Sequence, residues 1–350
     1  MQQIPVVVLS GFLGSGKTTL LNHLLRSARG TRIGVMVNDF GSIEIDAMTV
    51  AGQVGSTVSL GNGCLCCAVD ASELDTYLET LTRPSSRLDV IVIEASGLAE
   101  PRELVRMILA SDNERVVYGG LVQVVDAAEF DTTRARHPET DRHLAIADLV
   151  VVNKADRVDP DELRRVHTAV AELADRAAVI DAAYGRVDPE LLFDRAARSD
   201  DDRGPRQLTF EDLDDLYAVE DHHPHAAYET VSFTAAEPMH PRRLLDFLDS
   251  RPEGLYRIKG FVDFGDADPA NRYGVHAVGR FLRFYPEPWP RGEQRLTQLV
   301  LIGSGTDGEA LHKALDGCRV TGPQDAPEEH SMWGVLRYVP ERPEQEQPEG

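Results

Sequence analysis

The sequence has 350 residues, 42% of them hydrophobic, and its 58 acidic and 36 basic side chains give a formal net charge of −22. This composition is typical of a soluble globular chain with enough residues for one large domain or two ordinary ones. The negative charge argues against nucleic-acid binding, and no apolar run approaches the roughly 20 residues that a membrane-spanning helix needs. Because the apolar N-terminal stretch also lacks a preceding basic region, we expect a cytoplasmic protein with no membrane partner.

The N-terminal half alternates short apolar runs with helical patterns. The apolar runs are 4–10, 33–38, 90–94, 121–126, 149–153 and 178–181, and the helical stretches include 18–25, 72–82, 103–110 and 161–174. Most of the runs are continuously apolar, which indicates strands buried on both faces of a parallel sheet. The alternation predicts a doubly wound, mostly parallel α/β domain over residues 1–197.

The composition changes in the second half of the chain. Residues 198–227 are acidic and polar, which predicts a linker. From Tyr228 the pattern indicates a strand, a helix, several strands and a final helix, so we expect a smaller α+β domain over 228–322. The remainder, 323–350, is rich in Pro, Glu and Gln and predicts a mobile tail, although Trp333–Tyr338 carries apolar residues that could dock on a domain.

A glycine-rich loop, GFLGSGKT at Gly11–Thr18, lies between the first predicted strand and the first helical stretch. Its glycines allow backbone amides to face phosphate groups, and the helix that follows points its positive end at the same anions. We expect Lys17 to bridge the β- and γ-phosphates and the Thr18 hydroxyl to bind magnesium. The strand–loop–helix order argues against a chance match. The predicted nucleotide-binding residues here are Gly11, Gly14, Ser15, Gly16, Lys17, Thr18 and Thr19.

A second motif, Asn153-Lys154-Ala155-Asp156, directly follows the apolar run that ends at Val152. An aspartate held at a strand end can accept hydrogen bonds from both the ring N–H and the exocyclic amino group of guanine, a donor pair that adenine lacks. Such a four-residue match is weak alone, but its place downstream of a P-loop and at a strand end gives it weight. We therefore expect GTP as the nucleotide, bound in part by Asn153, Lys154 and Asp156.

Two further segments are candidates for the magnesium and γ-phosphate site. Glu94 ends a buried run, so it could hold magnesium, and the Gly97 amide could sense the γ-phosphate; the alternative is a loop carboxylate in solvent. Asp39 is a candidate switch residue near the same metal, or else a simple turn aspartate. No glutamine or arginine is evident to position the attacking water, so turnover is expected to be slow until a partner binds. The predicted catalytic residues are Lys17, Thr18, Asp39 and Glu94.

Three of the four cysteines crowd into Cys64-Leu65-Cys66-Cys67. Thiolates are soft ligands that suit zinc, while cobalt and copper can compete, and the flanking glycines Gly61 and Gly63 allow a tight turn around one ion. A redox pair and buried structural thiols are the competing interpretations. The fourth, Cys318, lies alone in the predicted final helix and is expected to be an ordinary packed residue.

Four motifs in this order, GFLGSGKTTL, NGCLCC, EASGLAEP and NKAD, resemble the CobW family of P-loop GTPases, also described as zinc-regulated or metal-chaperone GTPases. The likeness is strong over about residues 1–195, including YGRVDPELLF near Tyr184. It is weaker from Tyr228 to Cys318, where Arg257–Gly260 resembles an R-x-K-G element of the family's C-terminal domain.

The resemblance implies a GTP-hydrolysing metallochaperone. Cys64, Cys66 and Cys67 would hold a divalent ion, zinc by preference with cobalt possible, and the GTP state would control its release to an unidentified client metalloprotein. Asp39 and Ser42 stand where many family members have glutamate, which leaves any extra carboxylate ligand open. The histidines of the linker, His222, His223 and His225, are either a remnant of the family's longer histidine run or an exposed polar loop.

Two other functions fit the same features. A zinc-responsive regulatory protein would act on a partner through its C-terminal domain, with its binding changed by zinc and not by nucleotide. A zinc store would use the thiols and the negative charge, and it would bind several ions per chain. The sequence favours the chaperone, then the regulator, then the store.

Overall fold

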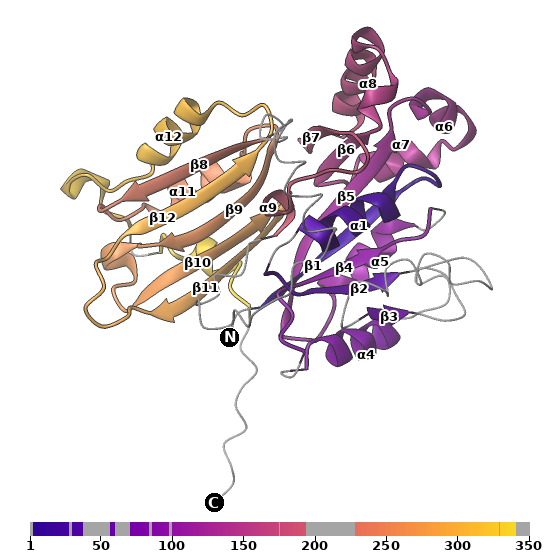
Figure 1. The fold of residues 1–350 in the computed structure, drawn as a ribbon. Helices are drawn as coiled ribbons and strands as arrows, with labels where there is room; N and C mark the ends of the chain where they lie inside the picture. The colour runs from indigo at the N-terminus through magenta and orange to yellow at the C-terminus, as the bar shows by residue number, and fades with distance from the viewer. Residues whose placement is uncertain are drawn as a thin grey trace, which may run out of the picture. The chain divides into compact units, whose positions relative to one another are not determined.

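The computed structural model describes residues 3–27, 30–37, 57–59, 71–83, 86–97, 100–174, 176–193, 228–328 and 330–340. The chain divides into two compact units, Met1–Tyr228 and Glu229–Gly350, each built on one sheet (Figure 1). Within the described ranges, no helix combines the length and apolar character that crossing a membrane requires.

The first unit contains a seven-stranded sheet in the order β3-β2-β4-β1-β5-β6-β7, and all of its paired strands are parallel. The strands are β1 (Ile4–Gly11), β2 (Ile33–Val37), β3 (Thr57–Ser59), β4 (Val90–Glu94), β5 (Val116–Asp126), β6 (Leu149–Asn153) and β7 (Ala178–Ala182). Every residue of β2, β4 and β6 is buried, as expected for strands covered on both faces. The predicted doubly wound parallel sheet is confirmed.

Helices alternate with these strands (Figure 1). They are α1 (Lys17–Ser27), α4 (Ala71–Leu81), α5 (Pro101–Leu109), α6 (Phe130–Arg136), α7 (Glu139–Leu144), α8 (Pro160–Leu173) and α9 (Pro189–Leu192), with a 3-10 turn at Ala155–Arg157. The start of α8 follows directly from the sequence, because the Asp159 carboxylate accepts hydrogen bonds from the Asp161 and Glu162 amides and Pro160 begins the helix.

The arrangement of strands predicts where a ligand binds. Strand β1 leads through α1 to β2, towards one edge of the sheet, whereas its neighbour β5 leads through α6 and α7 to β6, towards the other edge. In open α/β sheets, ligands bind in the crevice at the carboxyl ends of two such strands, where the connections diverge. The glycine-rich loop follows β1 at this point.

The second unit contains an antiparallel sheet in the order β11-β10-β9-β12-β8. Its strands are β8 (Glu229–Ala235), β9 (Leu255–Val262), β10 (Asn271–Val278), β11 (Phe281–Pro288) and β12 (Thr297–Gly303), and its helices are α11 (Pro241–Asp249), α12 (Gly308–Asp316) and α13 (Trp333–Leu336). The predicted smaller α+β domain is confirmed. The core lies between the helices and one face of this sheet.

The segment after α12 contributes to this core. Met332 and Val335 are buried with the sheet residues, and the Phe284 amide donates a hydrogen bond of 3.0 Å to the Tyr338 carbonyl. Residues 332–338 therefore pack on the core of the second unit, which agrees with the expectation that the apolar residues of Trp333–Tyr338 could dock on a domain. They lie within the stretch 323–350 that was predicted to be a mobile tail, and they pack because they bury apolar surface that the Pro- and Glu-rich residues around them lack.

Candidate nucleotide site

The glycine-rich loop connects the end of β1 to the start of α1. Gly14 and Gly16 both have positive φ, 80° and 103°, which is the region that glycine adopts without strain. Gly14 has open space around it, but a Cβ on Gly16 would lie 2.2 Å from Nδ2 of Asn153. Position 16 therefore requires glycine both for its backbone conformation and because a side chain would clash with Asn153. Position 14 requires glycine for its backbone conformation alone.

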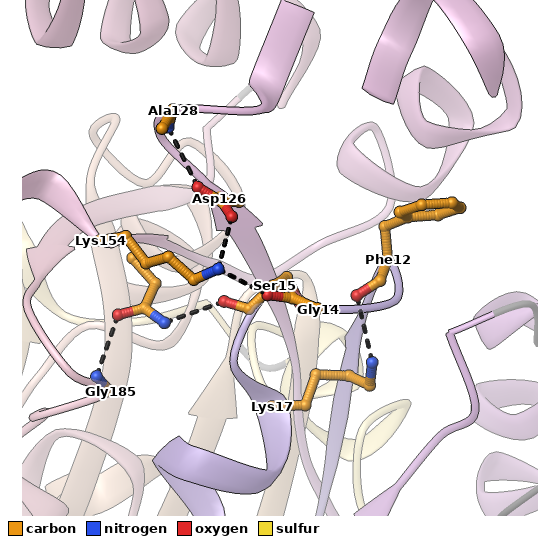
Figure 2. Close-up of polar contacts among 9 residues, drawn as sticks. Phe12, Gly14, Ser15, Lys17, Asp126, Ala128, Lys154 and Gly185 are labelled. Carbon is orange, nitrogen blue, oxygen red and sulfur yellow. Dashed lines mark hydrogen bonds and ion pairs between the residues drawn. The ribbon is translucent and has the colours of Figure 1, made fainter. Parts of the chain in front are cut away.

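Lys17 and Thr18, which were predicted to bind phosphate and magnesium, both make polar contacts where the loop meets α1. Lys17 is buried, and its Nζ donates to the Phe12 carbonyl at 3.3 Å, so the ammonium group lies over the loop (Figure 2). The Thr18 hydroxyl donates to Oε1 of Glu94 at 2.7 Å. Glu94 is buried at the carboxyl end of β4, the strand next to β1. Hydroxyl and carboxylate oxygens are the ligands that a hard cation such as magnesium prefers.

Asn153 and Lys154 join the loop to the neighbouring strand ends, and Figure 2 shows Lys154 between the loop and Asp126. Asn153 donates from Nδ2 to the Ser15 carbonyl at 2.9 Å, and its Oδ1 accepts from the Gly185 amide at 3.0 Å. Lys154 donates from Nζ to the Gly14 carbonyl at 2.8 Å and pairs with Oδ2 of Asp126 at 2.6 Å. The carboxyl ends of β5, β6 and β7 are thereby tied to the phosphate-binding loop.

The contacts of Asp126 were not expected from the sequence. Its Oδ1 accepts from the Ala128 amide at 3.1 Å while its other oxygen holds Lys154, so the carboxylate is fixed on both sides (Figure 2). The sequence did contain a signal, because Asp126 is the polar residue that ends a buried apolar run, at the same sheet edge as Glu94 and Asn153.

The loop after β4 approaches the phosphate-binding loop closely. A Cβ on Gly97 would lie 2.7 Å from the Leu13 amide nitrogen, so only glycine allows this approach. Asp156 lies in the 3-10 turn that directly follows Lys154. The structure therefore brings together the glycine-rich loop, Glu94, Gly97 and the Asn153–Asp156 motif.

A cavity of about 340 Å³ opens beside the loop, within the size range of small-molecule pockets. Its lining residues include Phe12, Gly14, Gln123, Phe130, His137 and Lys154. The Phe12 and His137 rings lie 4.3 Å apart, which supports the first turn of the loop. Gln123 is almost fully buried, and its Oε1 has no hydrogen-bond partner among the described residues.

Several predicted site residues lie outside the described ranges. These are Asp39, Cys64, Cys66, Cys67, His222, His223 and His225. In the part of the chain that the structure describes, no group of three or more His, Cys, Asp and Glu side chains could hold a metal ion.

The parallel sheet, the P-loop between β1 and α1, and the N-K-x-D motif that begins with the last residue of β6 define a P-loop GTPase. The model of the CobW/HypB/UreG nucleotide-binding domain matches residues 5–181, and that of the cobalamin synthesis protein cobW C-terminal domain matches 228–319. The chain belongs to this family, as its four motifs predicted, and it is a GTPase.

Two curated relatives match this chain over most of its length, and a third matches about half of it. A zinc chaperone CobW from Sinorhizobium sp is 30% identical over 345 residues, which cover 89% of this chain and 96% of the relative. Another from Pseudomonas aeruginosa is 32% identical over 360 residues, 90% of this chain and 91% of the relative. The zinc-regulated GTPase metalloprotein activator 1 of Schizosaccharomyces pombe is 31% identical over 197 residues, 54% of this chain and 48% of that protein.

Proposed function

We propose that this GTPase is a metallochaperone that carries a divalent metal, zinc by preference, on Cys64, Cys66 and Cys67. Binding and hydrolysis of GTP would control the transfer of the metal to a client metalloprotein. Three neighbouring thiolates suit zinc, and cobalt would compete for the same soft ligands. The names of the CobW relatives, zinc chaperones, support the choice of zinc.

The proposed coupling between the nucleotide and the metal is supported by three residues that lie in one row at the ends of three neighbouring strands. Val37, the last residue of β2, pairs with Glu94 of β4 on one side and with Ser59 of β3 on the other. Ser59 therefore lies two strands from Glu94, or about 10 Å at the usual strand spacing. The chain runs from Ser59 directly into the segment that carries the cysteines, and from Val37 into the segment that carries Asp39.

Magnesium fits the same edge of the sheet. Thr18 and Glu94 would supply the oxygen ligands, and Lys17 and the loop amides would hold the phosphates of GTP. A bound magnesium ion would neutralise charge on the phosphates during hydrolysis. Loss of the γ-phosphate would release Gly97, which follows Glu94, and Glu94 lies in the row of strand ends from which the chain enters the cysteine segment.

Such coupling must be reciprocal, because two ligands that bias one equilibrium change each other's affinity by the same factor. The thiolates also require a reducing compartment, so we propose the cytoplasm as the location. The direct test is the zinc affinity of the full chain with a non-hydrolysable GTP analogue, with GDP and without nucleotide. Three equal affinities would refute the coupling.

A hydrolysis assay completes this test. GTP turnover of the metal-free protein with magnesium is compared with and without one equivalent of zinc, for the wild type and for a Cys64/Cys66/Cys67→Ala variant. Zinc is expected to change the wild-type rate only. A Cys318→Ala variant is the matched control, because this buried thiol lies in the other unit and should leave the zinc effect intact.

A further inference from the structure

Unusual backbone conformations gather at the guanine-selecting end of the site. Among the described residues other than glycine, four have positive φ: Arg87, Lys154, Arg176 and Tyr184. Lys154 and Tyr184 follow the neighbouring parallel strands β6 and β7, whose last residues, Asn153 and Ala182, are paired in register. Two of the four strained residues therefore lie side by side at the edge of the sheet where the guanine-selecting motif begins.

The backbone around Tyr184, with φ of 55°, is held by contacts on both sides. The following amide, of Gly185, donates to Oδ1 of Asn153, and a Cβ on Gly185 would lie 2.7 Å from the Leu20 amide nitrogen of α1. The Arg186 amide closes the turn by donating to the Ala183 carbonyl at 3.1 Å. These contacts fix the left-handed conformation at residue 184 through the site itself.

The Tyr184 side chain contributes little to the stability of the fold. Left-handed backbone favours glycine or asparagine over an aromatic residue, because a Cβ crowds the following carbonyl. Tyr184 as a residue is 69% exposed, so burial of its apolar surface offsets little of this cost. A strained backbone therefore presents an exposed aromatic ring beside the residues that recognise guanine.

We propose that Tyr184 is a guanine-binding residue whose ring packs against the base held by Asp156. Aromatic rings stack on nucleobases, and the methylene chain of Lys154, fixed by Asp126 and the Gly14 carbonyl, supplies a second apolar surface at the same end of the site. Tyr184 thus adds affinity for the guanosine part of GTP and GDP and none for the phosphates. The proposal rests on the GTPase site and not on metal transfer.

Calorimetric titration of the full chain with GDP and with inorganic tripolyphosphate, both with magnesium, separates base binding from phosphate binding. Tyr184→Asn, which keeps the left-handed backbone, should weaken GDP binding about tenfold and leave the affinity for tripolyphosphate unchanged. Tyr184→Phe keeps the aromatic ring and should keep the GDP affinity within about twofold of the wild type. Arg176→Asn is the matched control, since Arg176 has the same backbone class at the opposite end of β7. If Tyr184→Asn weakens the binding of GDP and of tripolyphosphate equally, or leaves the GDP affinity unchanged, the proposal is overturned.

A Tyr184→Trp variant provides a direct readout of contact. Guanine stacked on the new indole should lower its fluorescence when GDP binds, whereas tripolyphosphate should not. The chain's two tryptophans, Trp289 and Trp333, belong to the second unit, and the wild type supplies their background signal. If the variant binds GDP with the same fluorescence change as the wild type, the ring does not contact the base.

Discussion

Thr18 and Glu94 are 76 residues apart in sequence, yet the Thr18 hydroxyl donates a hydrogen bond of 2.7 Å to the Glu94 carboxylate. The contact follows from the sheet, because β1 and β4 are parallel neighbours and Leu9 pairs with Glu94 in register. The second residue of α1 and the last residue of β4 therefore meet at the carboxyl edge of the sheet. Two oxygen ligands suitable for magnesium stand together beside the phosphate-binding loop.

Changing either predicted magnesium ligand should abolish most magnesium-dependent turnover. We expect Thr18→Ala and Glu94→Gln to slow GTP hydrolysis at least about 100-fold, because the first removes an oxygen ligand and the second removes the negative charge expected to hold the cation. Thr18→Ser keeps the hydroxyl and should keep most of the rate. Phosphate release across a range of magnesium concentrations measures this effect; a Thr18→Ala rate within threefold of the wild type would contradict the assignment.

The ion pair between Lys154 and Asp126 should matter for stability and for nucleotide binding. Its side chains are only 27% and 11% exposed, so Asp126→Ala leaves a half-buried ammonium group with the Gly14 carbonyl alone. We expect a loss of about 1–2 kcal/mol in the free energy of unfolding and about tenfold weaker GDP binding. Urea denaturation and calorimetry measure both quantities.

An exposed ion pair provides the control for this variant. Arg106 and Glu103 pair on the surface of α5 with 65% and 49% exposure, and Glu103→Ala should change stability by less than about 0.5 kcal/mol. Similar effects of the two alanine variants would mean that burial of the Lys154 pair contributes nothing.

Two glycines of the loop should differ in their tolerance of alanine. Gly14→Ala meets no atom within 4 Å and introduces only the cost of positive φ, about 1–2 kcal/mol. Gly16→Ala adds a clash with Asn153, which also holds Ser15 and Gly185. We expect Gly16→Ala to weaken GDP binding by at least about tenfold more than Gly14→Ala, as measured by calorimetry; the reverse order would contradict the packing argument.

The sequence predicted the strands well where a continuous apolar run marked them, and the motifs well where their residues have a fixed spacing. Strand β5 was predicted too short, because Gly119 and Gly120 interrupt its apolar run. Glycine suits this strand at position 119, because a Cβ there would lie only 3.0 Å from the backbone of Val6 in the neighbouring β1. Helices α6 and α7 were not predicted, because seven and six residues are too few to show a helical period.

The candidate site residues also differ in how far the sequence alone could predict them. Lys17, Thr18 and Asn153 belong to motifs with fixed spacing and could be assigned from the sequence. The contact of Asp126 with Lys154 and the position proposed for Tyr184 depend on which strand ends become neighbours, and a linear pattern does not contain this information. Asp39 and the cysteine cluster stay predictions, since they lie outside the described residues.

The thiol of Cys318 should be inert in the folded protein. The residue is buried, and burial raises the pKa of its thiol to about 11, so little thiolate forms at pH 8. Native alkylation followed by mass mapping should leave Cys318 unmodified, while full denaturation should expose it. The number of thiols modified in the native protein then reports on Cys64, Cys66 and Cys67 alone. Rapid modification of Cys318 would show that the turn after α12 opens.

One surface pair should make stability depend on pH. The hydrogen bond from Nε2 of His167 to Asp181, at 2.6 Å, raises the pKa of His167 above 6.5, because it favours the charged imidazolium. The folded state therefore binds the proton more tightly than the unfolded state. This stabilisation is complete below the unfolded pKa, near 6.5, and is lost as the pH rises through the folded pKa. Urea denaturation should show Asp181→Asn to be less stable than the wild type at pH 5.5, with the difference shrinking towards pH 9. A difference that does not change with pH would show that the pair contributes no proton-linked stability.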